Sequence, residues 1–73
     1  MNNELSEIVD EAVYRAMLTE RPSLVRAIAD CVAQGQTPAQ IERQMGKTPT
    51  VLGGMNFQML RNVRHIAEYL ARH

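Results

Sequence analysis

The chain has 73 residues, with eight acidic and eight basic side chains and a pI near 6.7. This length allows one domain, and only roughly 60% of the unfolded surface of so small a domain is buried on folding, so we expect self-association to supplement the core. The zero net charge excludes the global positive field of a dedicated nucleic-acid binder.

The N-terminal residues lack the basic and apolar segments of a signal peptide. No apolar run approaches the roughly 20 residues that cross a bilayer. Cys31 is the only cysteine, so no intrachain disulfide can form, which is typical of a reducing compartment. We therefore expect a cytoplasmic protein that does not enter a membrane.

Two amphipathic helices are predicted in the first half of the chain. Apolar residues recur at steps of three and four over 5–17, with the acidic side chains opposite, and this helix ends before Pro22. A second helix is predicted from Pro22 or Ser23 to Gln34, where Gly35 stops it. Its inward-facing residues are expected to be Leu24, Val25, Ile28, Cys31 and Val32.

Residues 36–49 carry two helix starts separated by one helix stop. Thr37, Pro38 and Gln40 have the form of a capping box, in which the Thr and Gln side chains each accept a hydrogen bond from the other residue's backbone N–H. This pattern predicts a third helix over about 38–45.

Gly46 stops the third helix, and Thr48-Pro49 repeats the start signal only two residues later. A helix, a tight turn and a helix in this order form the helix-turn-helix layout, which we place at about 38–61. The fourth helix is predicted to run from Pro49 to residue 72. Its apolar seam consists of Leu52, Met55, Met59, Val63, Ile66 and Leu70.

The predicted fold is therefore all-α, a single four-helix domain over residues 1–73 that contains a helix-turn-helix. The methionines of the second half are expected to fill its core rather than to form a binding patch. The seam of the fourth helix exceeds what three short helices can cover, so we expect a homodimer through this helix.

Residues 24–63 resemble the DNA-binding helix-turn-helix of LuxR-type response regulators in their pattern of residue classes. In that family an apolar helix ends in Ala-x-Gly-x-Thr, as residues 33–37 do here, and an Ile follows four residues later, as Ile41 does. A Leu-Gly or similar turn comes next, here Met45-Gly46. The resemblance implies DNA binding, with 49–61 as the recognition helix in the major groove.

The positions that read bases in that family carry Lys, Thr, Ser or His, and here they are Gly53, Gly54 and Met55. Glycine has no side chain that reaches a base edge, so DNA binding is expected to be weakly sequence-selective. The glycine pair can break the segment, so that a new helix starts near Asn56. Alternatively the helix is continuous, and the missing side chains let the backbone of a partner come close to it. We predict the continuous helix, because the apolar steps cross the glycines without losing phase.

The charges are divided unevenly along the chain. Residues 1–35 hold six acidic side chains and three arginines, whereas 36–73 hold five basic and two acidic ones, so the halves carry −3 and +3. The basic residues of the fourth helix are expected to form a solvated face, and the alternative is a surface for an acidic partner, either DNA phosphates or an acidic protein. An exposed Phe57 or Tyr69 would anchor a protein interface. The candidate nucleic-acid-binding or partner-binding residues are Arg43, Lys47, Thr50, Gly53, Gly54, Met55, Phe57, Arg61, Arg64 and His65.

Two functions follow from these residues. The first is a small DNA-binding transcription regulator in which the arginines and Lys47 hold phosphates. The alternative is a protein-interaction module, such as a phage- or plasmid-type inhibitor or adaptor. No catalytic, metal-binding or cofactor motif is present, and His65 with Glu68 is predicted to be a solvated ion pair, so we do not expect an enzyme.

Overall fold

Four α-helices account for most of the residues that the structure, a computed structural model, describes, namely 2–47 and 55–73. They are α1 (Asn2–Glu20), α2 (Pro22–Ala33), α3 (Pro38–Gly46) and α4 (Phe57–Arg72), and these described ranges contain no strand. The predicted all-α class with four helices is confirmed. No helix within these ranges combines the length and the hydrophobicity needed to cross a bilayer.

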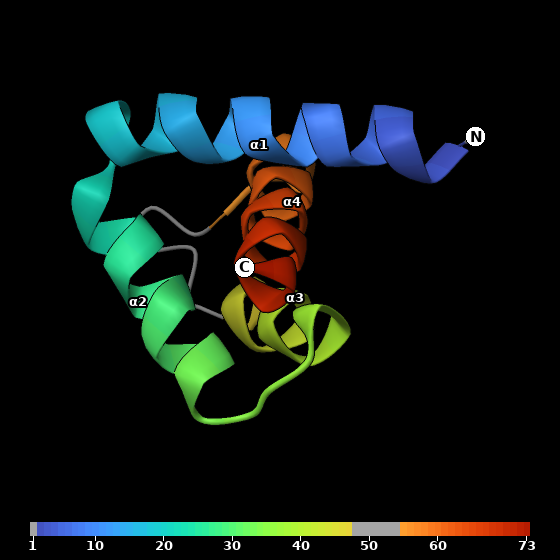
Figure 1. Ribbon diagram of the computed structural model, residues 1–73. Coiled ribbons are helices and arrows are strands. Elements are labelled where there is room, and N and C mark those ends of the chain that lie inside the picture. Colours follow the sequence, from blue (N-terminus) through green and yellow to red (C-terminus); the bar gives the residue numbers. More distant parts are fainter. Residues whose placement is uncertain (1, 48–54) are drawn as a thin grey trace.

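Helix α4 lies at the centre of the domain and packs against each of the other three helices. Figure 1 shows α1 crossing α4 on one side and α3 crossing it on the other, with α2 running between those two levels. Met45, Met55 and Met59 pack against the core, as predicted. The buried residues that form the core are Met17, Val25, Ile28, Ile41, Val63, Ile66 and Ala67.

The junction between α2 and α3 has the caps that the sequence predicts. Gly35 adopts a φ of 89°, and the backbone N–H of Gln36 donates to the Cys31 carbonyl, which is the Schellman ending of a helix. Two residues later the capping box is complete, since Thr37 Oγ1 accepts from the Gln40 N–H and Gln40 Oε1 accepts from the Thr37 N–H.

The two glycines at these helix ends should respond to alanine in opposite directions. Gly35→Ala should lower the free energy of unfolding by about 1 kcal/mol, because an L side chain strains the left-handed backbone. Gly46→Ala should raise it by about 0.5 kcal/mol, because the helical residue gains propensity and its Cβ would lie 3.5 Å from Leu60 Cδ1, an ordinary contact.

Chemical denaturation of the parent and both variants measures this difference. A Gly46→Ala midpoint below that of the parent would contradict the helical backbone conformation of Gly46. A Gly35→Ala midpoint at or above that of the parent would contradict the left-handed conformation of Gly35.

The predicted continuous fourth helix is wrong at its N-terminus. Met55 and Asn56 are not helical, and α4 begins at Phe57. Asn56 has extended backbone, and its side chain accepts a hydrogen bond of 2.8 Å from the Met59 N–H, so it is the N-cap that stops the helix from extending backwards. The predicted turn and the glycine pair, residues 48–54, lie outside the described residues.

Helix α1 packs through only part of the predicted face, since Met17 is buried and Val13 packs against the core. Asp10, expected opposite the apolar stripe, is completely buried, while Leu5, Ile8 and Val9 are exposed. The physical reason is that Asp10 reaches His65 and Arg72 on α4, which follow it in the chain by more than fifty residues. The described seam of α4 is covered within the monomer by the other helices, so it offers no free face for the predicted dimer.

Candidate interaction surface

A groove of about 440 Å³ runs between α3 and the N-terminal half of α4. Its apolar part comes from Ala39, Leu60 and the edge of Phe57, and Gly46 leaves room beside Leu60 because it has no side chain. The lining residues are Ala39, Glu42, Arg43, Gly46, Lys47, Phe57, Leu60 and Arg64.

Phe57 is the most exposed large apolar side chain of the described part, at 74% of its accessible surface. The Asn56 cap fixes it as the first residue of α4, at the mouth of the groove. The Arg61 guanidinium carbon lies 5.7 Å from the centre of the Phe57 ring, within the range of a cation–π contact. An aromatic ring and an arginine therefore present one exposed pair.

The cations around the groove differ in their surroundings. Arg43, Lys47 and Arg61 are exposed and make no ion pair within the described residues. Arg64 instead donates to Glu68 at 2.8 Å and to Glu42 at 3.0 Å, and these hydrogen bonds raise the pKa of its guanidinium. Among the cations around the groove, the charges of Arg43, Lys47 and Arg61 are therefore the ones available to a partner.

His65 belongs to a buried cluster rather than to the groove's charged rim. Its Nδ1 lies 2.5 Å from one Asp10 carboxylate oxygen, and Arg72 Nη2 donates to the other at 2.6 Å. The hydrogen bond with Asp10 raises the pKa of Arg72. The predicted ion pair between His65 and Glu68 is therefore wrong, because Asp10 of α1 takes the imidazole and Arg64 takes Glu68.

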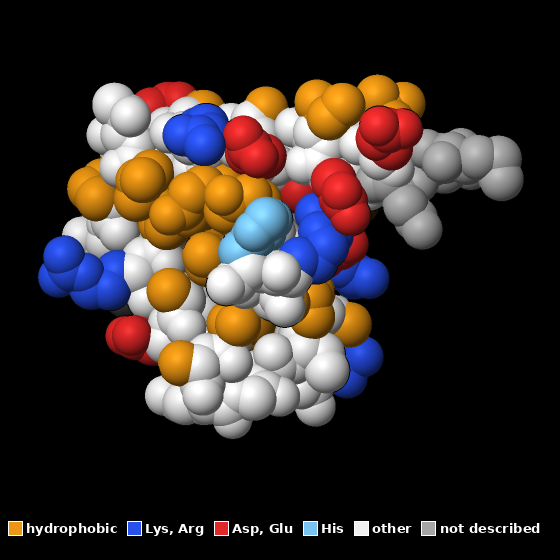
Figure 2. All heavy atoms as spheres, viewed as in Figure 1, with side chains coloured by type: hydrophobic (Ala, Val, Ile, Leu, Met, Phe, Trp, Pro, Cys, Tyr) orange, Lys and Arg blue, Asp and Glu red, His pale blue; other side chains and the backbone are white. Residues whose placement is uncertain are grey.

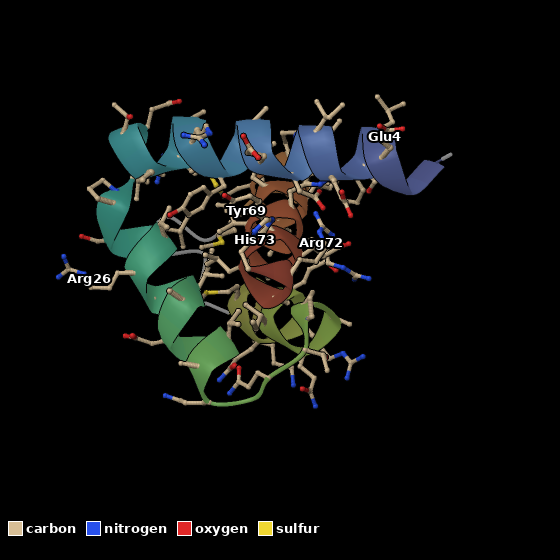
Figure 3. The ribbon with its side chains drawn as sticks, in the orientation of Figure 1. Glu4, Arg26, Tyr69, Arg72 and His73 are labelled. Atoms are coloured by element: carbon tan, nitrogen blue, oxygen red, sulfur yellow. The ribbon has the colours of Figure 1, made fainter. Side chains whose placement is uncertain are left out.

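The cluster joins the middle of α1 to the C-terminal half of α4, as Figure 3 shows for Arg72 beside α1. Beside it Tyr69 stacks between Tyr14, at 4.6 Å between ring centres, and His73, at 4.5 Å. Tyr69 is thus half-buried in an intramolecular stack, and Phe57 is the exposed aromatic residue of the two that the sequence proposed.

A smaller hollow of about 270 Å³ adjoins the groove, and His65 is among its described lining residues. Among the described residues no three His, Cys, Asp or Glu side chains are grouped as a metal-binding set.

The predicted site residues thus separate into three groups. Arg43, Lys47, Phe57 and Arg64 line one groove with Arg61 beside it, whereas Met55 is half-buried against the core and His65 is held by Asp10. Thr50, Gly53 and Gly54 lie outside the described residues. The residues that sequence reasoning missed are Ala39, Glu42 and Leu60.

Glu42, one of the residues that sequence reasoning missed, has a structural role. Here the Glu42 carboxylate crosses from α3 to Arg64 on α4 and joins the two helices. Comparison of the chain with protein-family models, curated proteins and solved structures found no match. The likeness to LuxR-type domains therefore stays a prediction from residue classes.

Proposed function

We propose that this protein is a cytoplasmic protein-interaction module whose α3–α4 groove binds an acidic, amphipathic segment of another protein. The observation that carries the proposal is the exposed Phe57 ring, 74% accessible, at the mouth of a groove with unpaired cations beside it. Aromatic residues and arginine are the residue types enriched at the centres of protein interfaces.

The chemistry of the groove specifies its occupant. Its apolar floor at Leu60 and Ala39 fits one or two aliphatic or aromatic side chains. Arg43 on α3 and Lys47, the residue that caps its C-terminus, line the same groove, and a carboxylate that reaches them forms charge-assisted hydrogen bonds. A helical segment with apolar residues three or four positions apart, flanked by Asp and Glu, satisfies both requirements.

DNA binding is the second candidate, and the three unpaired cations are the observation that favours it. Phosphate contacts need only such cations and give affinity without sequence selection. The exposed Phe57 ring weighs against this function, because a phosphate backbone offers no apolar surface to cover it. We therefore rank the protein partner first.

The test is affinity capture with the intact chain as bait in a lysate of the cells that produce it. The bait is compared with its Phe57→Ala, Arg43→Ala and Arg26→Ala variants. We expect one protein to be retained by the parent and by Arg26→Ala, even after nuclease treatment, and to be at least about tenfold depleted with the other two variants. Arg26 is the matched control because it projects from α2 away from the other helices (Figure 3).

Retention of nucleic acid, with a binding constant that falls steeply with salt and is lowered by Arg43→Ala but not by Phe57→Ala, would replace this proposal with DNA binding. Retention of a protein that Phe57→Ala leaves unchanged would reject the groove as the binding site. A bait that retains nothing above background would reject the proposal as well.

A further inference from the structure

Helix α1 has a second apolar face, which no other described helix covers. Leu5, Ile8 and Val9 are 66%, 62% and 40% exposed, and the exposed Ala12 and Ala16 extend the same stripe. Steps of three and four residues place these side chains on one side of the helix, away from the buried Asp10. Figure 2 shows hydrophobic side chains along its upper edge, where α1 lies.

Single exposed aliphatic side chains are ordinary, but a row of them on one helix is a contiguous apolar patch, and such patches mark interaction sites. We propose that this stripe, Leu5 to Ala16, binds the same stripe of a second copy of the chain, with the two α1 helices antiparallel. The contact is isologous, since one patch serves both protomers.

The charges beside the stripe favour this occupant and this direction. Glu4 and Arg15 are exposed on the same edge of α1, because eleven residues amount to about three helical turns. In an antiparallel pair related by a two-fold axis, the same edges of the two helices face each other. With the axis midway between Glu4 and Arg15, each Glu4 meets the partner's Arg15, and this midpoint falls within the apolar stripe.

A parallel pair would place the Glu4 and Arg15 edge of one helix beside the opposite edge of the other, because its two-fold axis runs along the helices. Glu4 would then not reach the partner's Arg15, and the contact would gain no ion pair at this edge. The antiparallel pair is the arrangement that adds the two ion pairs. Arg15 already pairs with Glu11 of its own helix at 3.1 Å, so it would lie between two carboxylates.

The dimer leaves the α3–α4 groove open, because α1 and α3 lie on opposite sides of α4 (Figure 1). The two surfaces are therefore tested independently. A failure of the dimer does not affect the groove, and a failure of the groove does not affect the dimer.

Sedimentation velocity from micromolar to millimolar concentration measures the association, with 8.2 kDa as the mass of the monomer. We expect a dimer that Ile8→Glu weakens by about 100-fold or more, because the carboxylate would be buried in the contact without a partner. Leu18→Glu is the matched control, since Leu18 is exposed on α1 but lies off the stripe, and this variant should dimerise like the parent.

Both variants alter exposed positions, so circular dichroism should give them the parent's helix content and verify that the fold is kept. A single 8.2 kDa species at millimolar concentration would overturn the proposal. A dimer that Ile8→Glu leaves intact would overturn it too, because the contact would then lie elsewhere.

The orientation has its own test. Glu4→Arg should weaken the dimer by about tenfold, and adding Arg15→Glu should restore it, because the swapped pairs attract again. In a Cys31→Ser background, Val9→Cys should form an intermolecular disulfide on oxidation, whereas Leu5→Cys should not, since the two copies of residue 5 would lie about 13 Å apart along the helices. Cross-linking at both positions would indicate the parallel arrangement and reject the antiparallel one.

Discussion

We expect Ile66→Ala to lower the free energy of unfolding by about 2–5 kcal/mol, the largest effect of any substitution considered for this chain. Ile66 is 0% exposed and lies on α4, the helix that packs against all three others. Truncation removes three carbon atoms from a close-packed core and leaves a cavity that four helices line. A domain this small has a stability of the same order, so the variant should be at the limit of folding.

Chemical denaturation followed by circular dichroism gives the difference between the parent and this variant. Leu18→Ala is the control, because it also shortens an aliphatic side chain on a helix, but at a position 46% exposed. Its midpoint should stay close to that of the parent. If Ile66→Ala lost no more stability than Leu18→Ala, the assignment of α4 as the centre of the core would be wrong.

Arg72→Ala should lower the free energy of unfolding by about 2–3 kcal/mol, because it leaves the fully buried carboxylate of Asp10 with the imidazole of His65 as its one remaining hydrogen-bond partner among the described residues. The guanidinium is itself about a third exposed, so part of its loss is compensated by water, and we expect less than the cost of breaking a fully buried pair. Denaturation midpoints again measure the effect.

A double-mutant cycle with Asp10→Asn separates the ion pair from the packing of the arginine side chain. In the Asn background, Arg72→Ala should be markedly less damaging, because no buried charge is left behind. Arg26→Ala serves as the exposed control and should leave the midpoint unchanged, since Arg26 is exposed on α2 and projects away from the other helices (Figure 3). Equal losses for Arg72→Ala in both backgrounds would refute a role for the buried charge.

Local signals predicted the fold class and most helix boundaries. The capping box at Thr37 and the glycine at position 35 act through hydrogen bonds within a few residues, so the sequence window that contains them is sufficient. The inward faces of α2 and α3 followed from hydrophobic periodicity, because these short helices have a single apolar side each.

Long-range effects decided the rest. In α1, periodicity placed Val13 and Met17 in the core correctly. It also predicted Leu5, Ile8 and Val9 there, which are exposed, because the buried face instead includes Asp10, whose partners lie 55 and 62 residues later. The start of α4 was misjudged because phase continued through the glycines, whereas the Asn56 cap set the boundary. The sequence predicted the cations and Phe57 of the groove. It did not predict Ala39 and Leu60, because these two residues lie close together only where α3 and α4 cross.

The central position of α4 has a consequence for the order in which the protein folds during synthesis. Domains fold as units once their parts have left the ribosome. Here α1, α2 and α3 are made first, yet each of them buries its core residues against residues 57–72. Until those residues emerge, Asp10 has no cation to meet and the nascent helices have no common core. We therefore expect one late and cooperative folding step, with no stable intermediate on the ribosome.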